Sequence, residues 1–220
     1  MVVDDDEFSR VTLARILRKL QISRIREASN GIKALNDLRS LGRVDCMFLD
    51  FDMPEMNGLE LLKAIRDGSA NVTRKTPIIM LTAHNNIGLT RTAIALDVSA
   101  FLSKPASAEV IKNRLLRVRT ADLGLREPEV YAEVVLPNLR LQNRPVPVSQ
   151  ERDAGAGVLM RLEEVPVNAR VARSVVGPDG SELLPKGTVL TTKLLIYLHD
   201  LLDLDRCVAE LWVEFEGVGG

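Results

Sequence analysis

Three aspartates follow one another near the start of the chain, directly after a short apolar run. These residues are Asp4, Asp5 and Asp6, and the run before them is Met-Val-Val. Two like charges about 4 Å apart repel each other by roughly 4 kcal/mol at an effective dielectric constant of about 20. A folded chain tolerates such repulsion where a cation binds or where the side chains point into solvent. Other residues of the sequence distinguish between these two interpretations.

Three more polar residues each follow an apolar run. Asp50 follows VDCMFL, Thr82 follows PIIML, and Lys104 follows AFLS. Where such runs are strands of one parallel sheet, their carboxyl ends share an edge, and ligands bind there. We therefore expect Asp4, Asp5 and Asp50 to converge. Because carboxylate oxygens suit a hard cation, these residues predict a Mg²⁺ site.

The same edge would suit a phosphoryl group on Asp50. A carboxylate can act as the nucleophile in phosphoryl transfer. The modified side chain would add negative charge to an acidic pocket, so it would need Mg²⁺, a cationic side chain and a hydroxyl donor around its oxygens. Lys104 can supply the charge and Thr82 the hydroxyl.

Regular secondary structure must position these side chains. Residues 1–118 alternate short apolar runs with amphipathic stretches, as βα units around a parallel sheet do. The apolar spacing predicts five helices, the second beginning at Ser29-Asn30-Gly31, and Asp6 and Glu7 are predicted to be solvated acids at the start of the first. The alternation predicts an α/β fold with a doubly wound, five-stranded parallel sheet. The predicted strands are residues 1–3, 22–28, 44–49, 77–81 and 100–103.

Four motifs occur in order on these elements. They are the acidic pair after the first strand, the L-D-x-x-M-P-x-M-x-G segment at 49–58, Thr-Ala at 82–83 and Lys-Pro at 104–105. With them, residues 1–118 resemble the CheY-like receiver domain of a two-component response regulator. The resemblance implies a flavodoxin-like sheet in the order 2-1-3-4-5 and Mg²⁺ as cofactor. It also implies that a sensor histidine kinase or a phosphotransfer protein is the phosphoryl donor.

The resemblance further implies roles around the metal. Asp50 resembles the phosphoacceptor and a metal ligand, Asp5 a direct ligand, and Asp4 a ligand that reaches the metal mainly through water. Asp52 would lend its backbone carbonyl to the metal, or it is a surface residue whose carboxylate does nothing.

The resemblance implies a switch as well. Thr82 and Phe101 resemble switch residues, and the aromatic ring would turn inward on activation; the alternative is that Phe101 is a plain core residue. A cis peptide bond before Pro105 would aim Lys104 inward. His84 is predicted to be a surface residue near the pocket.

The second half of the chain differs from the first in composition and in its pattern of apolar residues. Residues 121–157 are rich in proline and end in DAGAG, which predicts a linker with one or two short strands, so that the first domain spans residues 1–120. Residues 158–216 alternate apolar and polar positions and include one helix-like stretch at 191–202, which predicts a small, mostly β domain. It resembles the small β module that often accompanies HD-type cyclic-dinucleotide phosphodiesterases.

Composition excludes several classes of protein. Residues 1–120 carry 19 Lys and Arg against 14 Asp and Glu, whereas residues 121–220 carry 10 against 16. An acidic second half argues against nucleic-acid binding. With no apolar run of about 18 residues and no signal peptide, we expect a cytoplasmic protein without membrane contact. Cys46 and Cys207 fit no metal-ligand spacing and are predicted to be buried free thiols.

Two functions remain. The first is a phosphorylation-activated switch, itself not an enzyme, whose tail forms a homodimer or docks another protein. The alternative is a receiver that regulates an enzymatic output, such as a cyclic-dinucleotide or nucleotide hydrolase. The dipeptide His199-Asp200 invites this second interpretation, but the only other histidine, His84, lies in the receiver. We therefore predict that the dipeptide is the exposed end of a helix, and we favour the first function.

Overall fold

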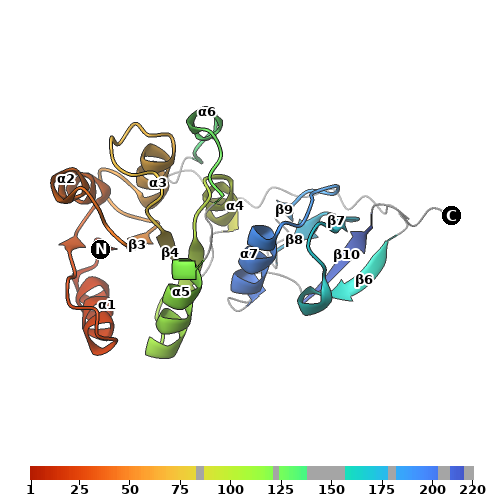
Figure 1. Cartoon of the computed structure of the whole chain (residues 1–220), viewed down its shortest axis with the longest axis horizontal. Helices are drawn as coiled ribbons and strands as arrows, with labels where there is room; N and C mark the ends of the chain where they lie inside the picture. Colours follow the sequence, from red (N-terminus) through yellow and green to blue (C-terminus); the bar gives the residue numbers. More distant parts are fainter. Residues whose placement is uncertain (83–86, 121–123, 138–156, 178–181, 203–208, 216–220) are drawn as a thin grey trace. The chain divides into compact units, whose positions relative to one another are not determined.

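The chain forms two compact units. The computed structural model describes residues 1–82, 87–120, 124–137, 157–177, 182–202 and 209–215. The first unit is Met1–Leu136 and the second is Pro137–Gly220 (Figure 1). None of the helices in these described ranges has the length and apolar character that crossing a bilayer requires.

The first unit is an α/β fold with a five-stranded parallel sheet. Its strands pair in the order β2-β1-β3-β4-β5, which confirms the flavodoxin-like order implied by the resemblance. The strands are β1 (Val2–Val3), β2 (Glu27–Ala28), β3 (Met47–Asp50), β4 (Ile78–Thr82) and β5 (Ala100–Ser103). The helices are α1 (Glu7–Lys19), α2 (Gly31–Leu41), α3 (Gly58–Arg66), α4 (Ile87–Ala95), α5 (Ala108–Thr120) and α6 (Pro128–Ala132).

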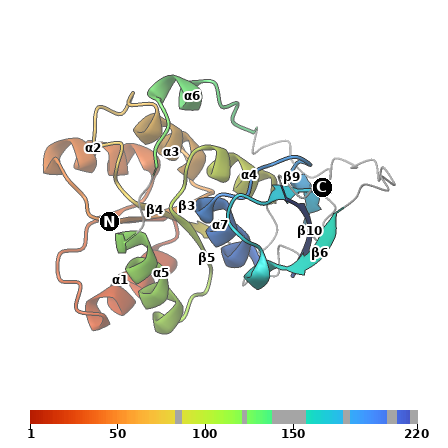
Figure 2. The same cartoon turned by 45° about the vertical axis from the view of Figure 1, so that its right-hand side comes forward.

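Helices cover both faces of this sheet. Figure 2 shows α1 and α5 against one face and α2, α3 and α4 against the other. Because side chains alternate between the faces of a strand, every second residue of β3, β4 and β5 contributes to the layer beneath α1 and α5. That layer is aliphatic apart from one phenylalanine, and its buried members are Val2, Leu13, Leu17, Phe48, Ile79, Leu81, Ala100, Leu102, Ile111 and Val118.

The second strand is much shorter than the predicted run of residues 22–28. β2 contains only Glu27 and Ala28, which pair with Val2 and Val3 of β1. The reason is the length of β1: a two-residue strand offers no further partners for a parallel ladder. Residues 22–26 therefore precede the strand, and of these the carbonyl of Arg26 accepts a hydrogen bond from the N–H of Val2 at 2.8 Å.

Side-chain caps explain where the first two helices begin. The Asp6 carboxylate accepts a hydrogen bond from the backbone N–H of Ser9 at 2.7 Å, and this bond lowers the pKa of Asp6. The Asn30 side chain accepts from the N–H of Lys33 at 2.8 Å. Caps of this kind satisfy backbone donors that have no partner inside the helix. Both helix-start predictions are confirmed.

The predicted linker of residues 121–157 does not hold for residues 124–136. Residues 124–136 belong to the first unit and include α6, whose Tyr131 is completely buried. Pro128 begins this helix, because proline fits the first helical position, where a backbone N–H would have no partner. Proline therefore indicates a helix start here and not the predicted linker. Residues 121–123 and 138–156, with the short strands predicted in this stretch, lie outside the described residues.

The second unit is mostly β with one helix, consistent with the prediction. A three-stranded antiparallel sheet has the order β6-β10-β7, and a separate antiparallel pair joins β8 and β9. The strands are β6 (Val158–Arg161), β7 (Arg170–Val171), β8 (Val175–Val176), β9 (Glu182–Leu184) and β10 (Glu210–Glu214). A 3₁₀ turn (Leu162–Glu164) follows β6, and α7 (Thr192–Leu202) supplies the helix.

His199-Asp200 lies in the last turn of α7, and Cys46 directly precedes β3. Asp200 is completely buried and His199 is half-buried, so the prediction that His199-Asp200 is an exposed helix end is wrong. Asp200 lies three residues after the buried Tyr197 and therefore shares its inward face.

Cys46 is a half-buried free thiol, and burial raises its pKa to about 12. Cys207 lies outside the described residues.

Candidate functional site

The carboxyl ends of the central strands carry the predicted residues to one edge of the sheet. In the register of the sheet Val3 lies beside Leu49, so Asp4 and Asp50 end neighbouring strands. Thr82 lies beside Ser103 at the ends of β4 and β5, and Lys104 follows directly. The convergence that we predicted from the apolar runs is therefore present.

Lys104 joins two carboxylates at this edge. Its Nζ atom lies 2.5 Å from an oxygen of Asp50 and 2.7 Å from an oxygen of Asp4. The backbone N–H of Lys104 donates to the carbonyl of Thr82 at 2.9 Å, which fixes the start of the side chain next to β4. The Lys104–Pro105 peptide bond is cis, as predicted.

Burial controls the electrostatics of these groups. Asp50 is only 7% exposed, and burial raises its pKa to about 6 despite the opposing effect of Lys104. Burial alone would lower the pKa of Lys104, but hydrogen bonds with Asp4 and Asp50 outweigh it and the pKa is raised. The ammonium group therefore stays charged and offsets part of the negative charge of the cluster.

The acidic cluster fits a hard cation. One carboxylate oxygen from each of Asp4, Asp5 and Asp50 can be chosen so that all three lie within 4.8 Å of one another. Asp4 and Asp50 are buried, whereas Asp5 is exposed, so the cluster opens to solvent on one side. Carboxylates that leave room for water are the ligands that Mg²⁺ prefers. The residues present thus suit the metal that the sequence predicted.

The remaining predicted residues surround this centre. Thr82 is buried at the end of β4. The side chain of Asp52 is exposed, and its backbone N–H donates to Oδ2 of Asp50 at 3.2 Å. Phe101 is completely buried, which fits both of its predicted roles, the switch aromatic and the plain core residue. His84 lies outside the described residues.

Two further residues support the site and were not predicted. Arg10 of α1 donates from Nη1 to the carbonyl of Asp4 at 2.8 Å, which holds the acidic segment against the helix. Gly58 begins α3, and a Cβ atom there would lie less than 3.0 Å from the backbone carbonyl of Asp50. Its place in the motif at 49–58 was the available signal, but the close approach of two backbone segments is visible only in the fold.

Comparison with known proteins identifies the first unit. Residues 1–116 match the response regulator receiver domain family. The chain belongs to this family. The matched residues contain the whole acidic edge, so the receiver domain and the site described above coincide.

Relatives of the receiver domain include chemotaxis proteins. Chemotaxis protein CheY1 of Helicobacter pylori is 32% identical over 115 residues, which are 52% of this chain and 91% of that protein. The chemotaxis protein CheY homolog of Campylobacter jejuni is 33% identical over 115 residues, 52% of this chain and 87% of that protein. A crystal structure of a protein from Chloroflexus aurantiacus described as a response regulator has 26% identity and a TM-score of 0.50, covering 55% of this chain and 95% of that one.

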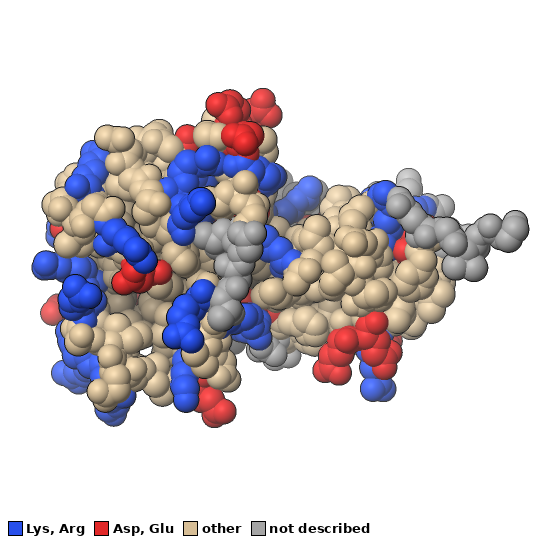
Figure 3. Space-filling view, viewed as in Figure 1, with Lys and Arg blue, Asp and Glu red and all other residues tan. Residues whose placement is uncertain are grey.

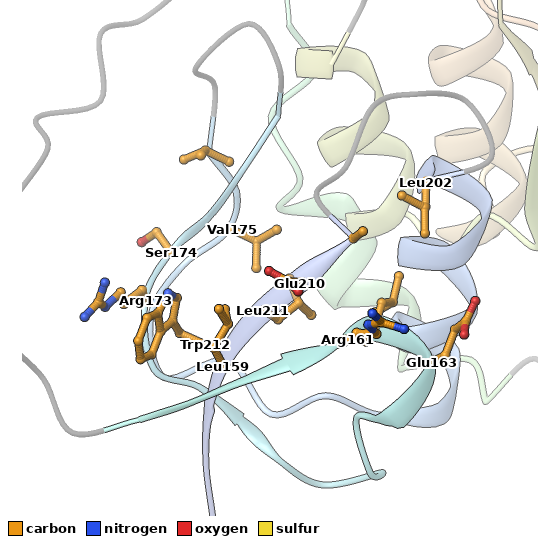
Figure 4. A pocket seen from close by; sticks show the side chains of 13 residues that line it. Leu159, Arg161, Glu163, Arg173, Ser174, Val175, Leu202, Glu210, Leu211 and Trp212 are labelled. Carbon is orange, nitrogen blue, oxygen red and sulfur yellow. The ribbon is translucent and has the colours of Figure 1, made fainter.

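Outside the receiver domain, a cavity of about 870 Å³ lies in the second unit. At one end the guanidinium of Arg173 lies 3.9 Å from the centre of the Trp212 ring, and at the other Arg161 and Glu163 line it (Figure 4). Basic and acidic side chains are both present. The cavity therefore shows no single charge preference.

Proposed function

We propose that this protein is a phosphorylation-activated response regulator that accepts a phosphoryl group on Asp50 from a histidine kinase or a phosphotransfer protein. The observation that carries the proposal is the bridge of Lys104 between Asp4 and Asp50. It lies at the edge of the sheet where β4 ends with Thr82. A nucleophilic carboxylate, a cation and a hydroxyl thus lie together.

These residues have complementary parts in the transfer. An Asp50 oxygen forms a bond to the phosphorus atom as the bond between that atom and the donor nitrogen breaks. Lys104 balances charge on the phosphoryl oxygens, and Thr82 donates a hydrogen bond to one of them. Mg²⁺ held by Asp4, Asp5 and Asp50, with the carbonyl of Asp52, would supply further charge stabilisation when bound. Phe101 and Thr82 would then form the switch.

A phosphorylation assay tests this assignment. Labelled acetyl phosphate should modify the wild-type protein only when Mg²⁺ is present, and Asp50→Asn should abolish the label. The matched control is Asp45→Asn, because Asp45 is an exposed aspartate shortly before β3, whereas Asp50 is the last residue of β3. Label retained on Asp50→Asn at the wild-type level would contradict the proposal.

We propose that the second unit is a binding module without enzymatic activity of its own, and that it pairs with a second copy. β6 lies at an edge of its sheet and exposes Val158 by 55% and Leu159 by 45%. Within the part of the chain that the structure describes, β6 pairs only with β10, and an edge strand with apolar side chains can pair with another strand. A unit of this size is also only marginally stable alone, and symmetric pairing would bury more of its apolar surface.

Light scattering on the full chain tests the pairing. We expect association that depends on concentration, that responds to beryllofluoride with Mg²⁺, and that Leu159→Lys abolishes. Val167→Ser is the control, since Val167 is equally exposed but lies outside the β6 edge. A monomer under all conditions would exclude self-association, and a foreign protein partner would then replace the second copy.

A further inference from the structure

Residues 124–136, which we call the strap, fold across the receiver domain after α5. The Nζ atom of Lys63, on α3, donates to the carbonyls of Ala132 and Val134 at 2.8 and 2.7 Å. In Figure 3 acidic side chains gather at the position of α6, with Lys and Arg side chains directly beside them. The strap is therefore held by specific hydrogen bonds from α3.

Asp97 is the main attachment point of the strap. Its Oδ2 atom accepts hydrogen bonds from the hydroxyl of Tyr131 at 2.5 Å and from Nε of Arg126 at 3.1 Å. The Tyr131 ring is completely buried and lies near two guanidinium groups, 5.1 Å from that of Arg126 and 5.6 Å from that of Arg74. Loss of the hydrogen bonds from Tyr131 and Arg126 would leave the buried Asp97 carboxylate with fewer donors, which costs free energy. These bonds therefore stabilise the strap in its bound position.

The strap also forms a hydrogen bond with the last residue of α4. Arg126 donates from Nη2 to the carbonyl of Ala95, the last residue of that helix, and Asp97 follows two residues later. The other end of α4 begins at Ile87, five residues after Thr82. One end of α4 is thus close in sequence to Thr82 at the acidic edge, and the other end is bonded to the strap.

We propose that the strap holds α4 in the arrangement of the unphosphorylated receiver and is released when Asp50 is phosphorylated, so that the chain leading to the second unit reports the state of the site. This inference rests on the proposed phosphorylation of Asp50. In the structure Lys104 is bonded to Asp50 while the strap is seated, so both contacts belong to the same state. Two sites that bias one element must influence each other reciprocally.

The experiment measures this coupling in the full chain with beryllofluoride and Mg²⁺. Beryllofluoride should increase hydrogen exchange within residues 124–136 of the wild-type protein. Conversely, Tyr131→Phe removes the hydroxyl that donates to Asp97 and accepts from the backbone N–H of Arg126, and this variant should bind beryllofluoride about fivefold more tightly. Arg126→Gln should act in the same direction and covers the case in which Tyr131→Phe does not fold. Val135→Ser is the control within the strap, because Val135 is 87% exposed, and its affinity should match the wild type.

The outcomes separate the two proposals. Unchanged or weaker affinity in the folded variants, together with unchanged exchange in the strap, would overturn the coupling while leaving phosphorylation of Asp50 intact. A wild-type protein that does not bind beryllofluoride with Mg²⁺ would overturn the proposed function and the coupling with it. An effect of equal size in Val135→Ser would also overturn the coupling, since it would show a general loosening rather than the loss of the Asp97 contact.

Discussion

Lys104 Nζ lies 2.5 Å from an Asp50 carboxylate oxygen, although β4 separates the strands that carry the two residues. The lysine side chain therefore extends across the end of β4. The same ammonium group reaches Asp4 on the far side, so one cation offsets charge on two buried carboxylates. Any group that binds at this edge must compete with Lys104 or share it.

Removing that ammonium group should cost stability when no metal is present. Lys104→Met leaves Asp4 and Asp50 buried without their cation, and we expect the free energy of unfolding to fall by about 1–3 kcal/mol. Urea denaturation with and without Mg²⁺ checks this, because the metal should restore part of the loss. Lys112→Met, at an exposed position of α5, should leave the free energy of unfolding unchanged both with and without Mg²⁺. An unaltered Lys104→Met protein in metal-free buffer would mean that the bridge contributes nothing to folding.

The hydroxyl of Thr82 should matter for the modified state more than for folding. Thr82→Ala removes a hydrogen bond to a charged phosphoryl oxygen, so the affinity for beryllofluoride with Mg²⁺ should fall by about tenfold. Thr82→Ser keeps the hydroxyl and should bind nearly as well as the wild type. Equal loss in the two variants would point to packing of the methyl group as the cause.

Gly58 should tolerate no side chain. The Cβ atom of Gly58→Ala would press on the backbone carbonyl of Asp50, which cannot rotate away, and we expect a loss of about 3 kcal/mol together with impaired phosphorylation. Gly42→Ala provides the comparison. Gly42 has a φ of 71° but nothing within 4 Å of its Cβ position, so only backbone strain of roughly 1 kcal/mol is expected there. Thermal melts and labelling with acetyl phosphate give both quantities.

Tyr131 should make stability depend on alkaline pH. Burial, and then the hydrogen bond to Asp97, raise the pKa of Tyr131 above its ordinary value of 10.0. The folded state therefore favours the protonated phenol. This contribution is fully present below the unfolded pKa and is lost as the pH rises through the folded one. Ultraviolet absorbance of tyrosinate should show one delayed titration that Tyr131→Phe removes, and this variant should lose less stability above pH 10.0 than the wild type.

The position at which the receiver ends can be tested by shortening the chain. A chain that ends after residue 136 should keep the melting temperature of the receiver, because the strap is retained. A chain that ends after residue 120 exposes the surface that Tyr131 covers and should lose about 2–3 kcal/mol from that side chain alone. Equal stability of the two shortened chains would show that the strap is dispensable for folding.

The acidic edge was predictable from the sequence because parallel sheets have a general geometry. Apolar runs followed by Asp4, Asp50, Thr82 and Lys104 predict convergence whatever the details of packing, since all strands of such a sheet end at the same edge. Helix starts were predictable for a similar reason: a cap such as Asn30 acts within one turn of its own helix. Both signals are local.

Only the tertiary structure decided which distant groups meet. Tyr131 and Asp97 are 34 residues apart, and no local pattern links them, so the prolines predict a linker although residues 124–136 belong to the first unit. The exclusion of a side chain at Gly58 and the burial of Asp200 likewise depend on neighbours brought from elsewhere in the chain. Apolar periodicity specifies which face of an element turns inward, whereas the partners on that face, and hence the charge and space around each residue, follow from the packing of the whole unit.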